Sequence, residues 1–338
     1  MQQALDLAIK GMGMVSPNPM VGCVIVHEGK VIGEGYHEKY GGLHAEPNAV
    51  NSVEDKNLIK DATVYVTLEP CAHFGKTPPC ADLLASLKPK RVVICNNDPN
   101  PLVAGKGIQK LRDAGISVET GILEKEGREL NKRFFTFQEK KRPYIILKWA
   151  QTADGFIARE NYDSKWISNE ASRQLVHQWR TEEAGIMVGT NTALHDNPQL
   201  NVRHVTGKNP TRIVIDKTLR IPKDFHLFDQ SQSTIIYNQV KTLEDNQNQF
   251  VQLDFSQNII PQILSDLFDK KITSVIIEGG KQLLDGFIAL NLWNEARVFI
   301  ANTVFFKEGI EAPVVHRTLV SRQNIENDNL LVYTNQID

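Results

Sequence analysis

Short runs of β-branched and aliphatic residues alternate with helix-like segments along the whole chain, and this alternation limits the possible folds. In the first part, runs suited to strands lie at 21–26, 31–36, 63–68 and 91–95, and helical segments lie at 2–10, 45–53 and 79–87. In the second part, strands are expected at 144–150, 185–188, 212–215, 234–237, 274–277 and 297–301, and helices at 169–180 and 281–290. Strands that alternate with helices form sandwiches around a largely parallel sheet. The pattern therefore predicts an α/β protein, with a hairpin turn at Glu28–Lys30.

A break in the pattern near residue 142 indicates two domains, about the number expected for 338 residues. The segment 124–142 is charged and helical, and it ends in the run Lys140-Lys141-Arg142-Pro143, which is typical of a linker. All four cysteines precede residue 96, whereas all four tryptophans follow residue 148. We therefore expect two unlike domains, 1–142 and 143–338, rather than a duplication.

Charge and hydropathy exclude several classes of function. The formal net charge is -2, which argues against binding nucleic acid or an anionic membrane through bulk charge. No apolar run is long enough to span a bilayer, and the first residues lack the pattern of a secretion signal. These features predict a cytoplasmic protein, in which four cysteines indicate metal binding or buried thiols rather than disulfides. Cys23 and Cys95 lie within β-branched runs and are expected to be core thiols.

The other two cysteines fit a metal site. His44-Ala45-Glu46 begins one predicted helix, Cys71 follows a predicted strand, and Cys80 begins another helix. One imidazole and two thiolates can hold zinc and leave its fourth position open for water, whose pKa zinc lowers to about 7. Glu46 is then placed to move a proton from that water to a leaving amine. On spacing alone, two buried thiols and a helix-capping histidine remain an alternative, because the common deaminase signature places only two residues between its cysteines.

Longer motifs of the first half resemble a known family. In order, they are Ser16-Pro-Asn-Pro19, 21–26 (VGCVIV), His44-Ala-Glu46, 67–80 (TLEPCAHFGKTPPC) and 98–107 (DPNPLVAGKG). Together they resemble the deaminase domain of the bifunctional riboflavin-biosynthesis deaminase/reductase family. The resemblance implies a cytidine-deaminase-like α/β/α sandwich, zinc on His44, Cys71 and Cys80, and Glu46 as the proton shuttle. It also implies a phosphoribosylated diaminopyrimidinone substrate, in a pocket lined by Asn18, His37, His73, Lys76 and Thr77.

The second half contains a candidate nucleotide site. The predicted strand at 274–277 runs into Glu278-Gly279-Gly280, and a helix is expected from Lys281. Glycines between a strand and a helix allow backbone N–H groups and the helix dipole to face a phosphate. A simple tight turn is an equal alternative for this fragment, because no full G-x-G-x-x-G motif is present.

Further motifs of the second half resemble the reductase domain of the same family. They are 148–158 (KWAQTADGFIA), 164–168 (SKWIS), Arg180, 188–198 (VGTNTALHDNP), 200–203 (LNVR) and 212–216 (RIVID). The resemblance implies a dihydrofolate-reductase-like α/β fold and NADPH as cofactor. It places the cofactor near Ala150, Trp166, Thr192, Asp196, Lys217 and Gly280–Gly286 (Gly280, Lys281, Gln282, Leu283, Leu284, Asp285, Gly286). It places the substrate near Ser164, Arg180, Leu200, Arg203 and Glu278. Gly279-Gly280-Lys281 departs from the Gly-Pro-Thr of many relatives, which puts the contacts of the cofactor loop in doubt.

These observations predict a bifunctional enzyme. Its first domain hydrolyses the pyrimidine 2-amino group through zinc, and its second reduces the ribosyl group to a ribityl chain with NADPH. The expected product is 5-amino-6-(5-phosphoribitylamino)uracil, and the resemblance also implies a homodimer or higher oligomer. One alternative is a nucleoside or tRNA zinc deaminase with an unrelated nucleotide-binding domain, which predicts a basic groove with aromatic residues. Another is a non-catalytic zinc-stabilised binding module, which requires a fourth protein ligand.

Overall fold

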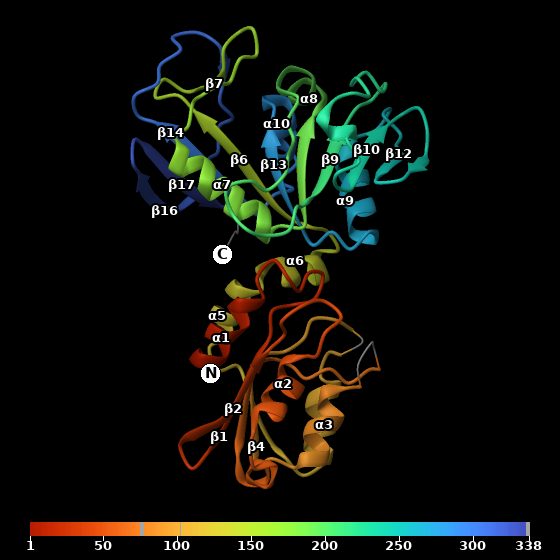
Figure 1. Cartoon of the computed structure of the whole chain (residues 1–338), viewed down its shortest axis with the longest axis vertical. Helices are drawn as coiled ribbons and strands as arrows, with labels where there is room; N and C mark the ends of the chain where they lie inside the picture. The colour runs from red at the N-terminus through yellow and green to blue at the C-terminus, as the bar shows by residue number, and fades with distance from the viewer. Residues whose placement is uncertain (75–77, 102, 336–338) are drawn as a thin grey trace. The chain divides into compact units, whose positions relative to one another are not determined.

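The chain forms two compact units, Met1–Lys141 and Arg142–Asp338, in a computed structural model that describes residues 1–74, 78–101 and 103–335. Each unit is built around a sheet of its own, and strands of both sheets are labelled in Figure 1. Within the described residues, no helix combines the length and the apolar character that crossing a membrane requires.

The sheet of the first unit has five strands in the order β2-β1-β3-β4-β5. Their bounds are β1 Gly22–His27, β2 Lys30–Tyr36, β3 Thr63–Leu68, β4 Arg91–Asn96 and β5 Ser117–Thr120. β3, β4 and β5 pair in parallel, but β1 is antiparallel to both of its neighbours. The expectation of a largely parallel sheet is therefore only partly correct. The reason is the predicted hairpin between β1 and β2, where Glu28 and Gly29 take the positive φ angles that a two-residue turn requires.

Helices cover both faces of this sheet. Their bounds are α1 Gln2–Ala8, α2 Ala45–Ser52, α3 Cys80–Leu87, α4 Lys106–Asp113, α5 Glu124–Leu130 and α6 Lys132–Lys140, with short 3-10 turns at Ile9–Gly11 and Lys56–Asp61. α2, α3 and α4 pack on the face that contains Cys23 and Ile25 of β1. α1 packs on the opposite face against Val24, and α6 adds Phe134 and Phe135 beside Leu68. The unit is therefore an α/β/α sandwich.

The second unit is built on a ten-stranded sheet in the order β11-β12-β10-β9-β8-β13-β6-β14-β17-β16. Its strands are β6 Tyr144–Gln151, β8 Gly185–Gly189, β9 Thr211–Ile215, β10 Thr234–Asn238, β11 Leu243–Asp245, β12 Asn248–Gln252, β13 Ser274–Gly279, β14 Glu295–Ala301, β16 Thr318–Ile325 and β17 Asp328–Thr334. A separate pair joins β7 Phe156–Ala158 to β15 Ile310–Glu311. The seven strands from β12 to β14 are parallel, and antiparallel strands close both edges.

Helices again lie on both faces of the second sheet. They are α7 Glu170–Glu182, α8 Thr190–Asp196, α9 Ile259–Asp269 and α10 Lys281–Ala289, with a 3-10 turn at His226–Phe228. α9 and α10 pack on the side of the sheet that contains Leu147 and Met187, whereas α7 and α8 pack on the side that contains Ile146 and Ile186. Ligands of such sheets bind outside the carboxyl ends of the parallel strands. A ligand site is therefore expected at the carboxyl ends of β6, β8 and β13.

Candidate functional site

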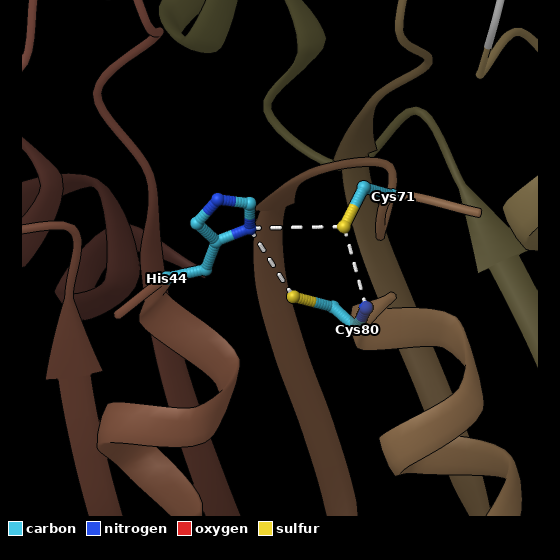
Figure 2. Close-up of side chains that lie close together, drawn as sticks. All are labelled: His44, Cys71 and Cys80. Atoms are coloured by element: carbon cyan, nitrogen blue, oxygen red, sulfur yellow. Dashed lines mark hydrogen bonds between the residues drawn. The ribbon is translucent and has the colours of Figure 1, made fainter. Parts of the chain in front are cut away.

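His44, Cys71 and Cys80 meet in the first unit from three different segments (Figure 2). His44 precedes α2, Cys71 follows β3, and Cys80 is the first residue of α3. The Nδ1 atom of His44 lies 3.7 Å from Sγ of Cys71 and 3.4 Å from Sγ of Cys80. Zinc bonds of about 2.1 Å to nitrogen and 2.3 Å to sulfur at tetrahedral angles separate the two ligand atoms by about 3.6 Å. The two nitrogen–sulfur distances therefore match those that one tetrahedral zinc ion requires, and all three donor atoms lie within 4.8 Å of one another.

The electrostatics of this cluster favour a cation. The Cys80 side chain and His44 hydrogen-bond to Cys71 and lower the pKa of its thiol to about 4. The contact with Cys71, together with burial, raises the pKa of Cys80. The hydrogen bond to Cys71 raises the pKa of His44. A cluster that already holds a thiolate beside an imidazole provides the soft ligands that zinc prefers.

Glu46 lies in the first turn of α2, two residues after His44, and only 3% of its surface is exposed. Burial is the main cause that raises the pKa of its carboxyl, and the negative charge of Cys71 adds to it. A carboxyl group with a raised pKa can both accept and return a proton near neutral pH. Glu46 therefore has the position and the environment of a proton shuttle.

Two of the five residues predicted to line the pyrimidine pocket adjoin the metal cluster. Asn18 Nδ2 lies 3.3 Å from Nε2 of His37, and Nδ1 of His37 lies 2.9 Å from the carbonyl oxygen of Leu43. The ring centroid of His37 lies 5.3 Å from that of His44. His73 is exposed, two residues after a metal-cluster cysteine. The predictions for Lys76 and Thr77 lie outside the described residues.

Glu69, in the 67–80 motif, has a role that was not predicted from the sequence. Its carboxylate is buried and accepts backbone N–H bonds from Asp98, Gly105, Gly107 and Ile108, at 3.0 to 3.3 Å. It therefore holds the loop after β4 and the start of α4 against the end of β3. Burial, reinforced by nearby negative groups, raises the pKa of Asp98 to about 6. The signal for Glu69 in the sequence was a carboxylate directly after a buried strand.

The second unit contains a cavity of about 1310 Å³ at the carboxyl ends of β6, β8 and β13. The residues predicted for the cofactor all line it, namely Ala150, Trp166, Thr192, Asp196, Lys217 and Gly280–Gly286. The residues predicted for the substrate also line it, namely Ser164, Arg180, Leu200, Arg203 and Glu278. The structure thus brings together side chains that lie as far apart in the sequence as residues 150 and 286. Which of them contact the cofactor and which the substrate stays a prediction.

The glycines between β13 and α10 form one wall of this cavity. The backbone N–H of Gly280 donates to Oγ1 of Thr192 at 2.9 Å. A Cβ atom on Gly279 or Gly280 would lie 3.2 Å from that same hydroxyl oxygen, so the close approach depends on both glycines. The nine-residue helix α10 begins directly after this contact. The junction is therefore a tight turn that also presents a helix N-terminus to the cavity, which is a suitable cradle for phosphate.

A buried charged group forms another part of the cavity wall. Arg180 Nε and Nη2 donate to Oε1 and Oε2 of Glu278 at 3.1 and 2.8 Å. Burial opposes ionisation of Glu278, but the charges of Arg180 and Lys148 lower the pKa of its carboxyl to about 2. Burial lowers the pKa of Lys148. Lys148 belongs to the 148–158 motif but was not predicted to belong to the site. The feature of the sequence that could have indicated it is a lysine within the apolar strand β6.

Aromatic and cationic side chains line a further part of the cavity. Trp166 is 70% exposed, and the guanidinium carbon of Arg173 lies 4.8 Å from its ring centroid. The rings of Tyr162 and His195 stack at 4.3 Å. Trp166 was predicted from the motif, whereas the other three lining residues were not assigned to the site. The exposed face of Trp166 remains available for stacking on a ring.

Two protein families match the two parts of the chain. Residues 1–96 match the cytidine and deoxycytidylate deaminase zinc-binding region, and residues 143–330 match the RibD C-terminal domain. Together with the three-donor cluster and the separate cavity, these matches define the class of protein. It is a zinc-dependent deaminase joined to a reductase in one chain.

The relatives of the chain make the assignment specific. It is 44% identical to the riboflavin biosynthesis protein RibD of Aquifex aeolicus over 309 residues, which cover 89% of this chain and 85% of that protein. It is 42% identical to RibD of Actinobacillus pleuropneumoniae over 325 residues, covering 93% and 86% of the two chains. A crystal structure of a diaminohydroxyphosphoribosylaminopyrimidine deaminase/5-amino-6-(5-phosphoribosylamino)uracil reductase from Thermotoga maritima matches with a TM-score of 0.90 at 36% identity, covering 99% and 97%. The chain belongs to the RibD family of riboflavin biosynthesis proteins.

These findings confirm several of the predictions from the sequence. The chain is a bifunctional deaminase and reductase of riboflavin biosynthesis, with zinc in its first activity and NADPH in its second. The predicted fold, a cytidine-deaminase-like domain followed by a reductase domain, is confirmed as well. An unrelated second domain and a non-catalytic zinc module are both excluded.

Proposed function

We propose that the first unit removes the 2-amino group of 2,5-diamino-6-(5-phosphoribosylamino)pyrimidin-4(3H)-one as ammonia. The second unit then reduces the ribosyl group of the product and yields 5-amino-6-(5-phosphoribitylamino)uracil. The name of the Thermotoga maritima relative supports this substrate and this order of steps. The observation that carries the proposal is the three-donor cluster beside the buried carboxyl of Glu46.

The residues of the deaminase site have distinct roles in this proposal. His44, Cys71 and Cys80 hold zinc, which lowers the pKa of water to about 7 and so supplies a nucleophile at neutral pH. Glu46 accepts a proton at its carboxylate and returns it to the amine that leaves. His37, whose ring contacts that of His44, and Asn18, which contacts His37, orient the pyrimidine ring.

His73, Lys76 and Thr77 complete the pyrimidine pocket in this proposal. The last two lie outside the described residues, so their part rests on the family motif at 67–80. The ammonium group of Lys76 is suited to the substrate phosphate.

The residues of the reductase site orient two ligands in one cavity. The hydride comes from the nicotinamide ring of NADPH, and the protein determines which atom it reaches. The first turn of α10, which follows the junction at Gly280, binds the cofactor phosphates through its backbone N–H groups. Arg203 binds the substrate phosphate, because a guanidinium group meets phosphate in a bidentate geometry. Arg180 and Glu278, which hold each other, fix the substrate side of the cavity.

The remaining cavity residues divide between the two ligands in the same proposal. We assign the cofactor to Ala150, Trp166, Thr192, Asp196, Lys217 and the segment Gly280–Gly286, and the substrate to Ser164 and Leu200 as well as the residues above. Residues 1–142 thus carry the deaminase and residues 143–338 the reductase. The free thiols of all four cysteines suit a cytoplasmic enzyme. We also propose that the enzyme is a homo-oligomer, and light scattering would give the number of its subunits.

A coupled assay tests the proposed function. The full chain with bound zinc is given the diaminopyrimidinone substrate and NADPH, and ammonia and NADPH are followed together. We expect ammonia release first and NADPH oxidation second, in equal amounts. NADPH oxidation that needs no prior ammonia release would contradict the proposed order, and ammonia release without any NADPH oxidation would contradict the second activity.

A further inference from the structure

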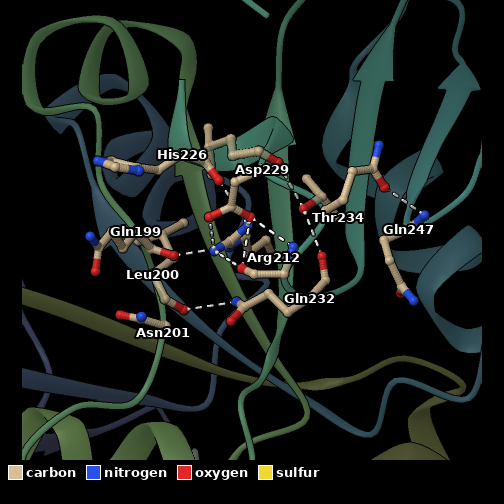
Figure 3. A network of polar contacts seen from close by, with 12 residues as sticks. Gln199, Leu200, Asn201, Arg212, His226, Asp229, Gln232, Thr234 and Gln247 are labelled. Carbon is tan, nitrogen blue, oxygen red and sulfur yellow. Dashed lines mark hydrogen bonds and ion pairs between the residues drawn. The ribbon is translucent and has the colours of Figure 1, made fainter. Parts of the chain in front are cut away.

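The buried side chain of Arg212 contacts the loop at 199–203, which contains the cavity residues Leu200 and Arg203 (Figure 3). Arg212 belongs to β9, and its side chain has no exposed surface. Nη1 donates to the carbonyl of His226 and to Oδ1 of Asp229, at 2.8 and 2.7 Å. Nη2 donates to Oδ2 of Asp229 and to Oγ of Ser231, at 3.3 and 3.1 Å. Nε points to the other side and donates to the carbonyl of Gln199 at 2.9 Å.

The two carbonyls that follow Gln199 are also held by side chains. Gln232 Nε2 donates to the carbonyl of Leu200 at 3.2 Å, and Arg180 Nη1 donates to the carbonyl of Asn201 at 2.9 Å. Leu200 has a φ of 50°, in the left-handed region that a leucine rarely adopts. Such a conformation persists only when the surrounding structure holds it. The loop is therefore held in place by hydrogen bonds from outside itself.

The position of Arg203 depends on residues of this same loop and on α7. Nη1 of Arg203 donates to the side-chain oxygen of Gln199 at 2.7 Å, and its backbone N–H donates to Nδ1 of His177 at 3.0 Å. Arg212 thus binds the main chain of Gln199, while Arg203 binds its side chain. Arg203 Nη1 also donates to Oδ1 of Asn201 at 2.7 Å, so Gln199 and Asn201 together connect the held loop with an arginine that lines the cavity.

We propose that Arg212, aligned by Asp229, is a positioning residue of the reductase that places Leu200 and Arg203 for the phosphorylated substrate. The inference rests on the proposed function, which assigns those two residues to substrate binding. Burial opposes ionisation of Asp229, but the hydrogen bonds from Arg212 and Ser231 hold the pKa of its carboxyl well below the usual range. The pair therefore stays charged at neutral pH, and the guanidinium keeps its fixed fork of donors.

Stabilisation of the core alone is a poor explanation for this pair. The side chain of Asp229 is 34% exposed, and an ion pair that solvent reaches adds little to stability. The planar guanidinium group of Arg212 joins the 226–231 segment to the carbonyl of Gln199 in one defined geometry. An apolar side chain cannot form these hydrogen bonds. A lysine at this position has a single nitrogen and cannot span both segments.

Steady-state kinetics of the full-length zinc enzyme test the proposal with Arg212→Lys. For the reductase, we expect KM for the deaminated substrate to rise about tenfold, the loss typical of one hydrogen bond to a charged group, with kcat within about twofold. The dissociation constant of NADPH and the deaminase kinetics should stay unchanged, because the hydrogen bonds of Arg212 and Gln199 described above involve neither the glycine junction nor the zinc ligands. A purely structural role would instead lower the amount of folded enzyme and leave KM unchanged.

Two further variants keep the test decisive. Gln232→Met removes the bonds to the carbonyls of Leu200 and Pro210. It also removes a buried side-chain oxygen that has no partner, so it should fold and raise KM in the same direction. Ser231→Ala removes a bond to Arg212 on the side away from the loop and should leave KM unchanged. An unchanged KM in folded Arg212→Lys and Gln232→Met would overturn the inference; if Arg212→Lys does not fold, an unchanged KM in Gln232→Met alone would overturn it. Lack of reductase activity in the unaltered enzyme would overturn the proposed function instead.

Discussion

The Nδ1 atom of His44 lies 3.4 Å from the Sγ atom of Cys80, although 36 positions separate the two residues in the sequence. α2 begins directly after His44, α3 begins at Cys80, and both helices pack on the same face of the first sheet. Each side chain therefore projects from the start of a helix toward one point. Cys71, at the end of β3, supplies the third donor at that point.

Replacement of Cys80 by serine should remove zinc from the enzyme. A hydroxyl group stays protonated where a thiolate is needed, so one of the three protein ligands is lost. Cys95→Ala is the matched control, because Cys95 is also buried in the first unit but donates to the carbonyl of Leu123. Metal analysis should find about one zinc per chain in the unaltered enzyme and the control, and much less in Cys80→Ser. Full zinc content in Cys80→Ser would refute its assignment as a ligand.

The residue types of the metal site could be predicted from the sequence, but its supports could not. His44, Glu46, Cys71 and Cys80 were recognisable because few side chains bind zinc or move protons. Glu69 acts through its backbone partners, which lie in the loop after β4 and in α4. Nothing in the local sequence shows which distant N–H groups a carboxylate will meet. The folded chain alone provides that information.

Removal of the Thr192 hydroxyl should weaken NADPH binding. Thr192→Val leaves the N–H of Gly280 without its acceptor and disturbs the junction that faces the cavity. Loss of this half-buried hydrogen bond costs about 0.5 to 1.5 kcal/mol, so the dissociation constant of NADPH should rise up to about tenfold. Thr192→Ser retains the hydroxyl and should bind within about twofold of the unaltered enzyme. Fluorescence titration gives both values, and equal affinity in all three proteins would contradict the role of this junction.

The Glu278 carboxylate should stabilise the second unit in a pH-dependent way. Its pKa falls from an ordinary 4.5 to about 2, so its contribution to the free energy of unfolding is complete above 4.5 and is lost as the pH falls toward 2. Glu278→Gln should lower that free energy by about 3 kcal/mol at neutral pH, because it breaks a buried ion pair. The difference between the two proteins should stay constant from about pH 8 to 5 and shrink below that.

The four tryptophans make this measurement selective, because all of them lie in the second unit. Denaturant unfolding followed by tryptophan fluorescence therefore reports on the unit that contains Glu278. A difference that grows as the pH falls, or no difference at neutral pH, would show that the ion pair with Arg180 does not stabilise the unit.

The fold shows a similar division between what could be predicted and what could not. The strand β3 was predicted with its observed bounds, because an apolar run between polar segments identifies a buried strand. α8 was not predicted, since TNTALHD is short and polar and its helical form depends on packing of Ala193 beneath it. β16 was also missed, because seven of its eight residues are exposed at the sheet edge and its pairing with β17 gives it strand form.

Glu46→Gln shows whether two independent sites act in sequence. The amide keeps the size of the side chain but cannot accept and return a proton. The measurement is ammonia release from the diaminopyrimidinone and NADPH oxidation on the deaminated substrate, in one zinc-loaded preparation. We expect loss of ammonia release, retained zinc and unchanged NADPH oxidation. Parallel loss of both activities with zinc still bound would contradict this expectation.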